Sequence, residues 1–222
     1  RKAKKYEGMI KVIIPIFSTF KNKKALPFIL GYGGHTYELF GFRSWTFPCI
    51  LFLSTYFKTP VTDAFIANAI GLMGFLGIFA SIYGARYCIN KDRAKVVSKM
   101  GLICFVGSII TAISFWYSFW LALLMLFIYN ALIVLDSGSL TTGVVINGKP
   151  EDRGVRLALH SMVGFFGGAL GGPIVGLILD NFGGQSSHIA WFLSFFCLGL
   201  GSLLSSLVVK HYYFSKNNEQ NR

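Results

Sequence analysis

The sequence predicts an all-α integral membrane protein, a bundle of six transmembrane helices. Three observations carry this prediction. Only 14% of the 222 residues are charged and 54% are hydrophobic, whereas about a quarter of the residues in a soluble domain are charged. Several uncharged stretches reach the length of about 20 mostly apolar residues that crosses a bilayer. The basic residues lie in blocks between these stretches, which indicates membrane topology and not a nucleic-acid partner.

The composition also excludes two other classes of protein. Phe supplies 22 residues, whereas disordered chains are poor in aromatic residues. The four cysteines are too sparse for a disulfide scaffold, because Cys49, Cys104 and Cys197 lie in apolar runs, where a thiol packs as a small hydrophobe. The sequence shows no metal-ligand cluster and no nucleotide-binding loop, so we expect neither a metal nor a cofactor.

The first element is a basic leader, residues 1–24, expected on the cytoplasmic side. Within it, residues 9–20 place apolar residues among lysines. This stretch is too short to span a membrane, and its pattern predicts an amphipathic segment at the membrane interface. The chain opens at Arg1 without an initiator Met and without a visible signal peptide. We therefore expect a chain that is truncated at its start.

The six spans form a bundle over residues 25–210. They are expected at residues 26–57, 62–86, 97–116, 119–147, 154–181 and 187–210, followed by a polar cytoplasmic tail, residues 211–222. The first span contains His35, Glu38 and Arg43 and is expected to be irregular near its start. There, Pro27 is followed by the string Gly31, Tyr32, Gly33, Gly34.

The third and fourth spans come from one uncharged run, residues 100–135. These 36 residues would make a single helix of about 54 Å, longer than the bilayer with its headgroups. The run should therefore be two helices. The break is expected in the aromatic group at residues 115–120, because Trp and Tyr concentrate at membrane interfaces.

Charge placement supports an even number of crossings. Residues 1–24, 85–99, 147–156 and 210–222 would share one side, and they hold eight, five, three and three Lys plus Arg. The opposite loops hold only Lys58. By the positive-inside rule, both termini are expected to be cytoplasmic.

Polar residues at membrane depth are the first functional candidates, because they are costly there and usually face a bundle interior. In the first span, His35 and Glu38 share a helical face with Phe42 and Trp45. Arg43 lies ~140° around from Glu38, so the two should not pair within a regular helix. We interpret Glu38 as a protonatable carboxylate with a His35 neighbour, and Arg43 as a partner for an anionic group. The alternative is that His35 and Glu38 only satisfy neighbouring polar groups.

The fourth span holds a second polar set. Its members are Asn130, Asp136, Ser137, Ser139, Thr141 and Thr142. In a continuous helix, Asn130, Ser137 and Thr141 form one stripe and Asp136 lies on an adjacent face. This helix is expected either to line an aqueous cavity or to bond to neighbouring helices, which is a common structural use of Ser and Thr in membranes.

The fifth span is rich in glycine. Gly164, Gly168, Gly172 and Gly176 recur every fourth residue, and Pro173 follows Gly172 directly. Glycines on one face allow another backbone to approach closely, and proline in the same turn removes a hydrogen bond. The pattern indicates either static tight packing or a close-packed helix that bends as the bundle moves.

These residues carry a resemblance to a known family. The string Gly168-x-x-x-Gly172-Pro173-x-x-Gly176 is similar to the glycine-proline motif of the fifth helix in a six-helix repeat of the major facilitator superfamily (MFS) of transporters. The strings from His35 to Trp45 and from Asp136 to Thr141 resemble those of prokaryotic members with poorly defined substrates. The resemblance covers all six spans and implies an MFS-type repeat in a prokaryotic cytoplasmic membrane.

The resemblance further implies half of a transporter, since a complete member has two six-helix repeats with the substrate held between them. A basic leader before the first span and a short tail after the sixth match the central loop and the natural end of the carboxy-terminal half, which is the half we expect. The leader would then be the remnant of the central loop, and the partners would be a small-molecule substrate, the lipid bilayer and the missing amino-terminal half. The resemblance assigns Asp92 and Arg93 to the cytoplasmic gating loop. This loop departs from the family pattern in its spacing and lacks the second glycine, so orientation charges are the alternative role.

The function expected from the resemblance is secondary transport by alternating access, coupled to an ion or proton, and not enzymatic activity. Glu38 or Asp136 would carry the proton, and Arg43 would contact a carboxylate or an anionic substrate. Two alternatives remain. One is an intramembrane hydrolase using Ser137 or Ser139 with His160. The other is a structural or homodimeric six-helix membrane protein.

Overall fold

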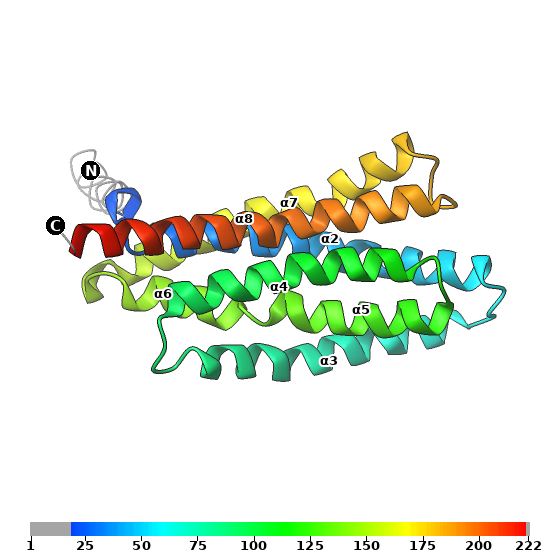
Figure 1. Ribbon diagram of the computed structural model, residues 1–222, viewed down its shortest axis with the longest axis horizontal. Helices are drawn as coiled ribbons and strands as arrows, with labels where there is room; N and C mark the ends of the chain where they lie inside the picture. Colours follow the sequence, from blue (N-terminus) through cyan, green and yellow to red (C-terminus); the bar gives the residue numbers. More distant parts are fainter. Residues whose placement is uncertain (1–18, 221–222) are drawn as a thin grey trace, which may run out of the picture.

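The described part of the computed structural model, residues 19–220, is helical and contains no strand (Figure 1). Side chains are described for residues 19–214, and most of the expected amphipathic segment, residues 9–18, lies outside this range. The elements are α2 (Leu26–Tyr56), α3 (Asp63–Tyr87), α4 (Arg93–Ser114), α5 (Phe119–Val134), α6 (Ser137–Ile146), the 3₁₀ turn η1 (Pro150–Asp152), α7 (Arg153–Asn181) and α8 (His188–Gln220).

Five helical segments of the described chain are long and apolar enough to cross a membrane. They are Asp63–Tyr87, Arg93–Ser114, Phe119–Ile146, Pro150–Asn181 and His188–Phe214. Large apolar side chains cover their outer faces, and Phe75 on α3 and Phe165 on α7 are 56% and 72% exposed. Soluble monomers rarely expose so much continuous apolar surface. The fold is therefore a membrane helical bundle.

Helix α2 lies at the centre of the bundle and packs most extensively against α7 and α8. The expectation of an irregular start was wrong, because α2 is regular from Leu26 onward. The Asn22 side chain accepts the backbone N–H groups of Lys24 and Ala25 at 3.0 and 3.2 Å, and Pro27 occupies the first turn, where its missing N–H is harmless. Gly34 lies inside the helix against the Gly201 carbonyl of α8, so its function is close packing.

The predicted break in the long uncharged run is confirmed. Helix α4 ends at Ser114 and α5 begins at Phe119. Ser118 caps α5, because its hydroxyl accepts the backbone N–H of Leu121 at 3.2 Å. The exposed Trp116, Tyr117 and Trp120 surround this turn, as expected for residues at a membrane interface.

The fourth span differs from the continuous helix that we expected, because it breaks into α5 and α6 at Leu135 and Asp136. The Leu135 carbonyl lies so close to Gly84 of α3 that a Cβ there would overlap it. The Leu135 N–H bonds the Leu132 carbonyl at 3.3 Å, a tighter turn than the α-helical pattern. Residues before and after the break therefore no longer form the single stripe predicted for a continuous helix.

One end of the bundle collects most of the described basic loop residues. The start of α2, the α3–α4 loop, the α6–α7 connection and the end of α8 all lie at the left in Figure 1. The basic residues in or next to these segments include Lys21, Lys23, Lys24, Arg86, Lys91, Arg93, Lys95, Lys149, Arg153 and Lys210. Lys58 follows α2 at the other end. The fold thus separates the charges as the sequence pattern requires.

Arg156 connects the short helix α6 to α7, and the sequence pattern did not identify it. Its side chain is 1% exposed. The guanidinium donates to the carbonyls of Val144, Lys149 and Val145 at 3.1, 2.9 and 3.2 Å. Carbonyls at a helix C-terminus have no partner within the helix, and a cation there is favourable. Arg156 therefore fixes the end of α6.

Replacing Arg156 with methionine is expected to lower the free energy of unfolding by about 3 kcal/mol, because three carbonyls would lose a charged donor. The measurement is detergent-denaturation equilibrium of the purified chain. Arg153→Met is the control, since Arg153 is exposed on the same helix. Equal stability of the two variants would contradict the role assigned to Arg156.

Candidate functional site

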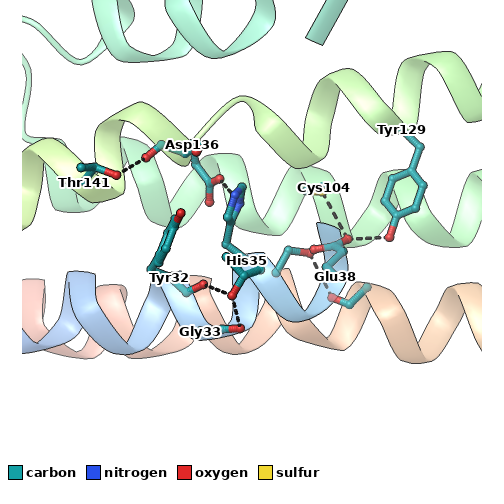
Figure 2. Close-up of polar contacts among 12 residues, drawn as sticks. Tyr32, Gly33, His35, Glu38, Cys104, Tyr129, Asp136 and Thr141 are labelled. Carbon is teal, nitrogen blue, oxygen red and sulfur yellow. Dashed lines mark hydrogen bonds and ion pairs between the residues drawn. The ribbon is translucent and has the colours of Figure 1, made fainter. Parts of the chain in front are cut away.

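The first part of the site surrounds Glu38, whose side chain is 1% exposed in the centre of α2. Tyr129 of α5 donates its hydroxyl to Glu38 Oε1 at 2.5 Å, and the Cys104 thiol of α4 lies 3.4 Å from the same oxygen. Ser202 of α8 also interacts with this carboxylate. Four helices thus meet at one buried acid (Figure 2).

The second part is the pair of His35 and Asp136. His35 Nδ1 lies 2.9 Å from Asp136 Oδ1, and the two residues are 2% and 4% exposed. Asp136 occupies the break between α5 and α6, and the carboxylate points from there toward α2 (Figure 2). The other ring nitrogen of His35, Nε2, has no hydrogen-bond partner among the described residues.

Tyr32 connects this pair to a second histidine. Its ring stacks on His35 with centroids 5.4 Å apart and on His160 of α7 with centroids 3.8 Å apart. His160 Nε2 lies 3.3 Å from the hydroxyl of Thr141 on α6. His160 Nδ1 is buried and finds no partner within the described part of the chain. Three helices therefore bring together two histidines with unused nitrogens.

The arrangement is a line of groups that can take up or release a proton. Asp136 contacts His35, and His35 lies one turn before Glu38 on α2. The line ends at Tyr32, Ser137 and Thr141, which are only half-buried. Buried acids beside histidines are the usual components of proton relays in membrane proteins.

The other polar candidates are placed outside this line. Asn130 donates to the Met73 carbonyl at 2.7 Å and so connects α5 to α3. Ser139 donates to the Gly84 carbonyl at 3.2 Å. Arg43 is exposed, whereas Glu38 is buried, and Arg43 makes no ion pair with any described residue. The expectation that Arg43 and Glu38 do not pair agrees with this geometry.

The serines proposed for a hydrolase have no histidine partner in the described part of the structure. Ser139 is bonded to α3, and the hydroxyl that contacts His160 belongs to Thr141. Ser137 contributes its backbone carbonyl, which accepts the Thr141 hydroxyl at 3.2 Å. A nucleophilic serine needs a base within hydrogen-bond reach, so no observed contact supports this alternative.

From Gly164 to Gly176, the glycines of α7 face α2, but not in the way the motif suggests. Gly168 lies against the ring of Phe40, and the Gly172 carbonyl accepts the indole N–H of Trp45 at 2.8 Å. The closest backbone contacts are made by the neighbouring Gly167 and Gly171. Gly164 meets Tyr32 and Thr36, and Gly176 meets Trp45. The every-fourth series therefore packs against side chains.

Pro173, the last member of this motif, is exposed on α7, and the helix continues through it. In the α3–α4 loop, Asp92 caps α4, because its carboxylate accepts the Lys95 N–H at 3.1 Å. The neighbouring Arg93 has an unpartnered Nη1 among the described residues. The capping contact explains Asp92 without a gating role.

Four residues of the site were not predicted: Tyr32, Cys104, Tyr129 and Ser202. They were part of a glycine string or of apolar runs, where aromatic and thiol side chains usually pack as hydrophobes. One signal was present for Tyr32, which lies three residues before His35 and hence on the same side of the helix. Cys104 and Tyr129 have no such signal, because their partner Glu38 lies on another helix.

Within residues 19–214, no group of three or more His, Cys, Asp or Glu side chains is placed to hold a metal ion. Comparison with protein-family models, with curated proteins and with solved structures found no match to this chain. The site therefore rests on its own geometry.

Proposed function

We propose that this chain is one six-helix half of a secondary transporter that moves a small solute by alternating access, coupled to protons. The single observation that carries the proposal is the buried pair of His35 and Asp136 at the break between α5 and α6. Interrupted helices near the middle of the membrane are where many secondary transporters bind substrates and coupling ions. Such a break is tolerated in lipid only where protein or a cavity satisfies the backbone.

In this proposal α2 is the sixth membrane span. Its 31 residues are long enough to cross a bilayer, and they include two charged residues, Glu38 and Arg43. Both described ends of the bundle would then lie on one side, which the positive-inside rule assigns to the cytoplasm. The resemblance to the MFS glycine-proline motif supports a six-helix repeat of such a transporter.

The residues take separate roles. Asp136 with His35 forms the proton-exchanging pair nearest the half-buried edge, and Glu38 is a second acid deeper in the bundle. The exposed Arg43 is free to contact an anionic group on the second half or on the substrate. Close packing of α7 on α2 keeps these groups together while the two halves rock.

The experiment is a flux measurement on the complete protein in sealed vesicles that contain a pH indicator. Pools of sugars, amino acids and carboxylates are added outside, and a transporter coupled to protons changes the internal pH with one pool and not with the others. A chain that moves no proton and no labelled solute with any pool contradicts the proposal. The structural or homodimeric alternative predicts that result.

Replacing Glu38 with glutamine is expected to reduce proton-coupled flux at least about tenfold, with the fold preserved. A glutamine oxygen can still accept the Tyr129 hydroxyl, but the amide cannot exchange a proton. The measurement is the dependence of uptake on external pH, and the matched control is Asp180→Asn, an exposed acid near the end of α7. Unchanged pH dependence in Glu38→Gln would remove Glu38 from coupling.

A further inference from the structure

A continuous groove follows α2 and α8 from the basic end of the bundle toward its middle. One stretch has a volume of about 380 Å³ and the other about 530 Å³, and Leu30 lines both. Lys23 lines the groove from the turn before α2. On α2 the lining residues are Leu26, Pro27, Leu30, Gly33, Gly34 and Tyr37, and on α8 they are Cys197, Leu200, Gly201, Leu204, Leu207, Val208, His211 and Tyr212. Each set follows the three- and four-residue spacing of one helical face.

The inner stretch is apolar and has a floor of backbone. Gly34 of α2 lies against the Gly201 carbonyl, and Gly167 of α7 lies against the Gly33 carbonyl. These glycines leave no side chains over the floor, while Phe166 and Leu170 of α7 form the second wall. At the deep end, the Tyr37 hydroxyl is 3.2 Å from Cys197 Sγ. The Tyr37 hydroxyl therefore already has a hydrogen-bond partner within the protein.

The outer stretch is mostly apolar but includes one lysine and one histidine. Lys23 and His211 line its mouth, which lies where α2 begins and where α8 runs toward the described end of the chain. From Leu26 to Tyr37 the groove follows 11 residue steps of α2, a distance of about 17 Å. That exceeds the ~15 Å depth of one leaflet's hydrocarbon, so the basic mouth falls at headgroup level when the inner stretch lies among acyl chains.

We infer that this groove binds one anionic phospholipid, whose phosphate lies between Lys23 and His211 and whose acyl chain fills the stretch between α2, α7 and α8. An apolar cleft in a membrane span is in contact with acyl chains, and basic pockets at the ends of membrane helices recruit anionic headgroups. This assignment is independent of transport, since none of the lining residues belongs to the His35–Asp136 pair.

The test is native mass spectrometry of the purified full chain with phosphatidylglycerol and phosphatidylcholine of identical acyl chains. The wild type is expected to retain one phosphatidylglycerol in preference to phosphatidylcholine. Lys23→Gln is expected to reduce this preference about fivefold, the effect of one basic residue near a membrane surface. The matched control is Lys95→Gln, which removes an exposed lysine near the same end of the bundle but outside the groove.

A second pair of variants tests the acyl-chain stretch. Leu30→Trp fills the junction of the two stretches and is expected to abolish retention of both lipids, whereas Leu76→Trp on the outer face of α3 leaves it unchanged. The two leucines are 42% and 45% exposed, so the substitutions are comparable. Equal retention of the two lipids by the wild type, equal effects of the two lysine variants, or lipid binding by Leu30→Trp would each overturn the inference. If the wild-type chain is a dimer and Leu30→Trp dissociates it, the groove binds a second copy of the chain and not a lipid.

Discussion

Replacing Gly167 with alanine is expected to destabilise the bundle by about 3 kcal/mol, the upper range for overpacking a well-packed interior. A Cβ at this position would meet the Gly33 carbonyl oxygen, with the Gly33 carbonyl carbon at 2.9 Å and the Thr36 hydroxyl at 3.1 Å. Backbone atoms inside a helix cannot rotate away as a side chain can. The methyl group would therefore force α7 and α2 apart, and these two helices share the most extensive contact in the fold.

Gly168→Ala is the informative comparison, because Gly168 belongs to the sequence motif and Gly167 does not. Its Cβ would meet only the ring of Phe40, which is 41% exposed and can move. Gly74→Ala on α3 is the control, since nothing lies within 4 Å of a Cβ there. Detergent-denaturation equilibrium of the three variants measures the difference. If Gly168→Ala were the more destabilising, the motif positions would form the closest contact after all.

The positions of the membrane helices followed from the sequence because they depend on local properties. Uncharged runs and interfacial aromatic residues placed the turn after Ser114, where the structure has it. The break at Asp136 could not be predicted in this way, because it is produced by a tertiary contact. Gly84 allows the Leu135 carbonyl to approach α3, and the sequence of the fourth span alone contains no proline to indicate an interruption.

The candidate site was predicted in part for a related reason. Charged residues stand out in an apolar sequence, so His35, Glu38 and Asp136 were found. Their partners are neutral and come from other helices. Tyr129 and Cys104 approach Glu38 only because α5 and α4 pack beside α2. Arg43 was selected by the same rule, although its side chain is exposed.

Replacing Asp136 with asparagine is expected to have the largest effect on function, a loss of proton-driven accumulation of about a hundredfold or more. The carboxylate is 4% exposed and lies 2.9 Å from His35 Nδ1. Removing one partner of a buried pair leaves the other without compensation, which costs about 3 kcal/mol when both are charged. The measurements are solute accumulation in vesicles and denaturation equilibrium of the same protein.

A double-mutant cycle separates a proton-exchanging pair from a merely structural contact. If His35 and Asp136 act as a unit, the variant carrying both His35→Gln and Asp136→Asn should transport no worse than Asp136→Asn alone, with a coupling free energy of at least about 1.5 kcal/mol. Facilitated exchange without a pH gradient should survive in both, because the solute can still cross when no proton has to move. Exchange and accumulation lost together, in variants that remain folded, would show that the pair holds the bundle or the substrate and does not carry the proton.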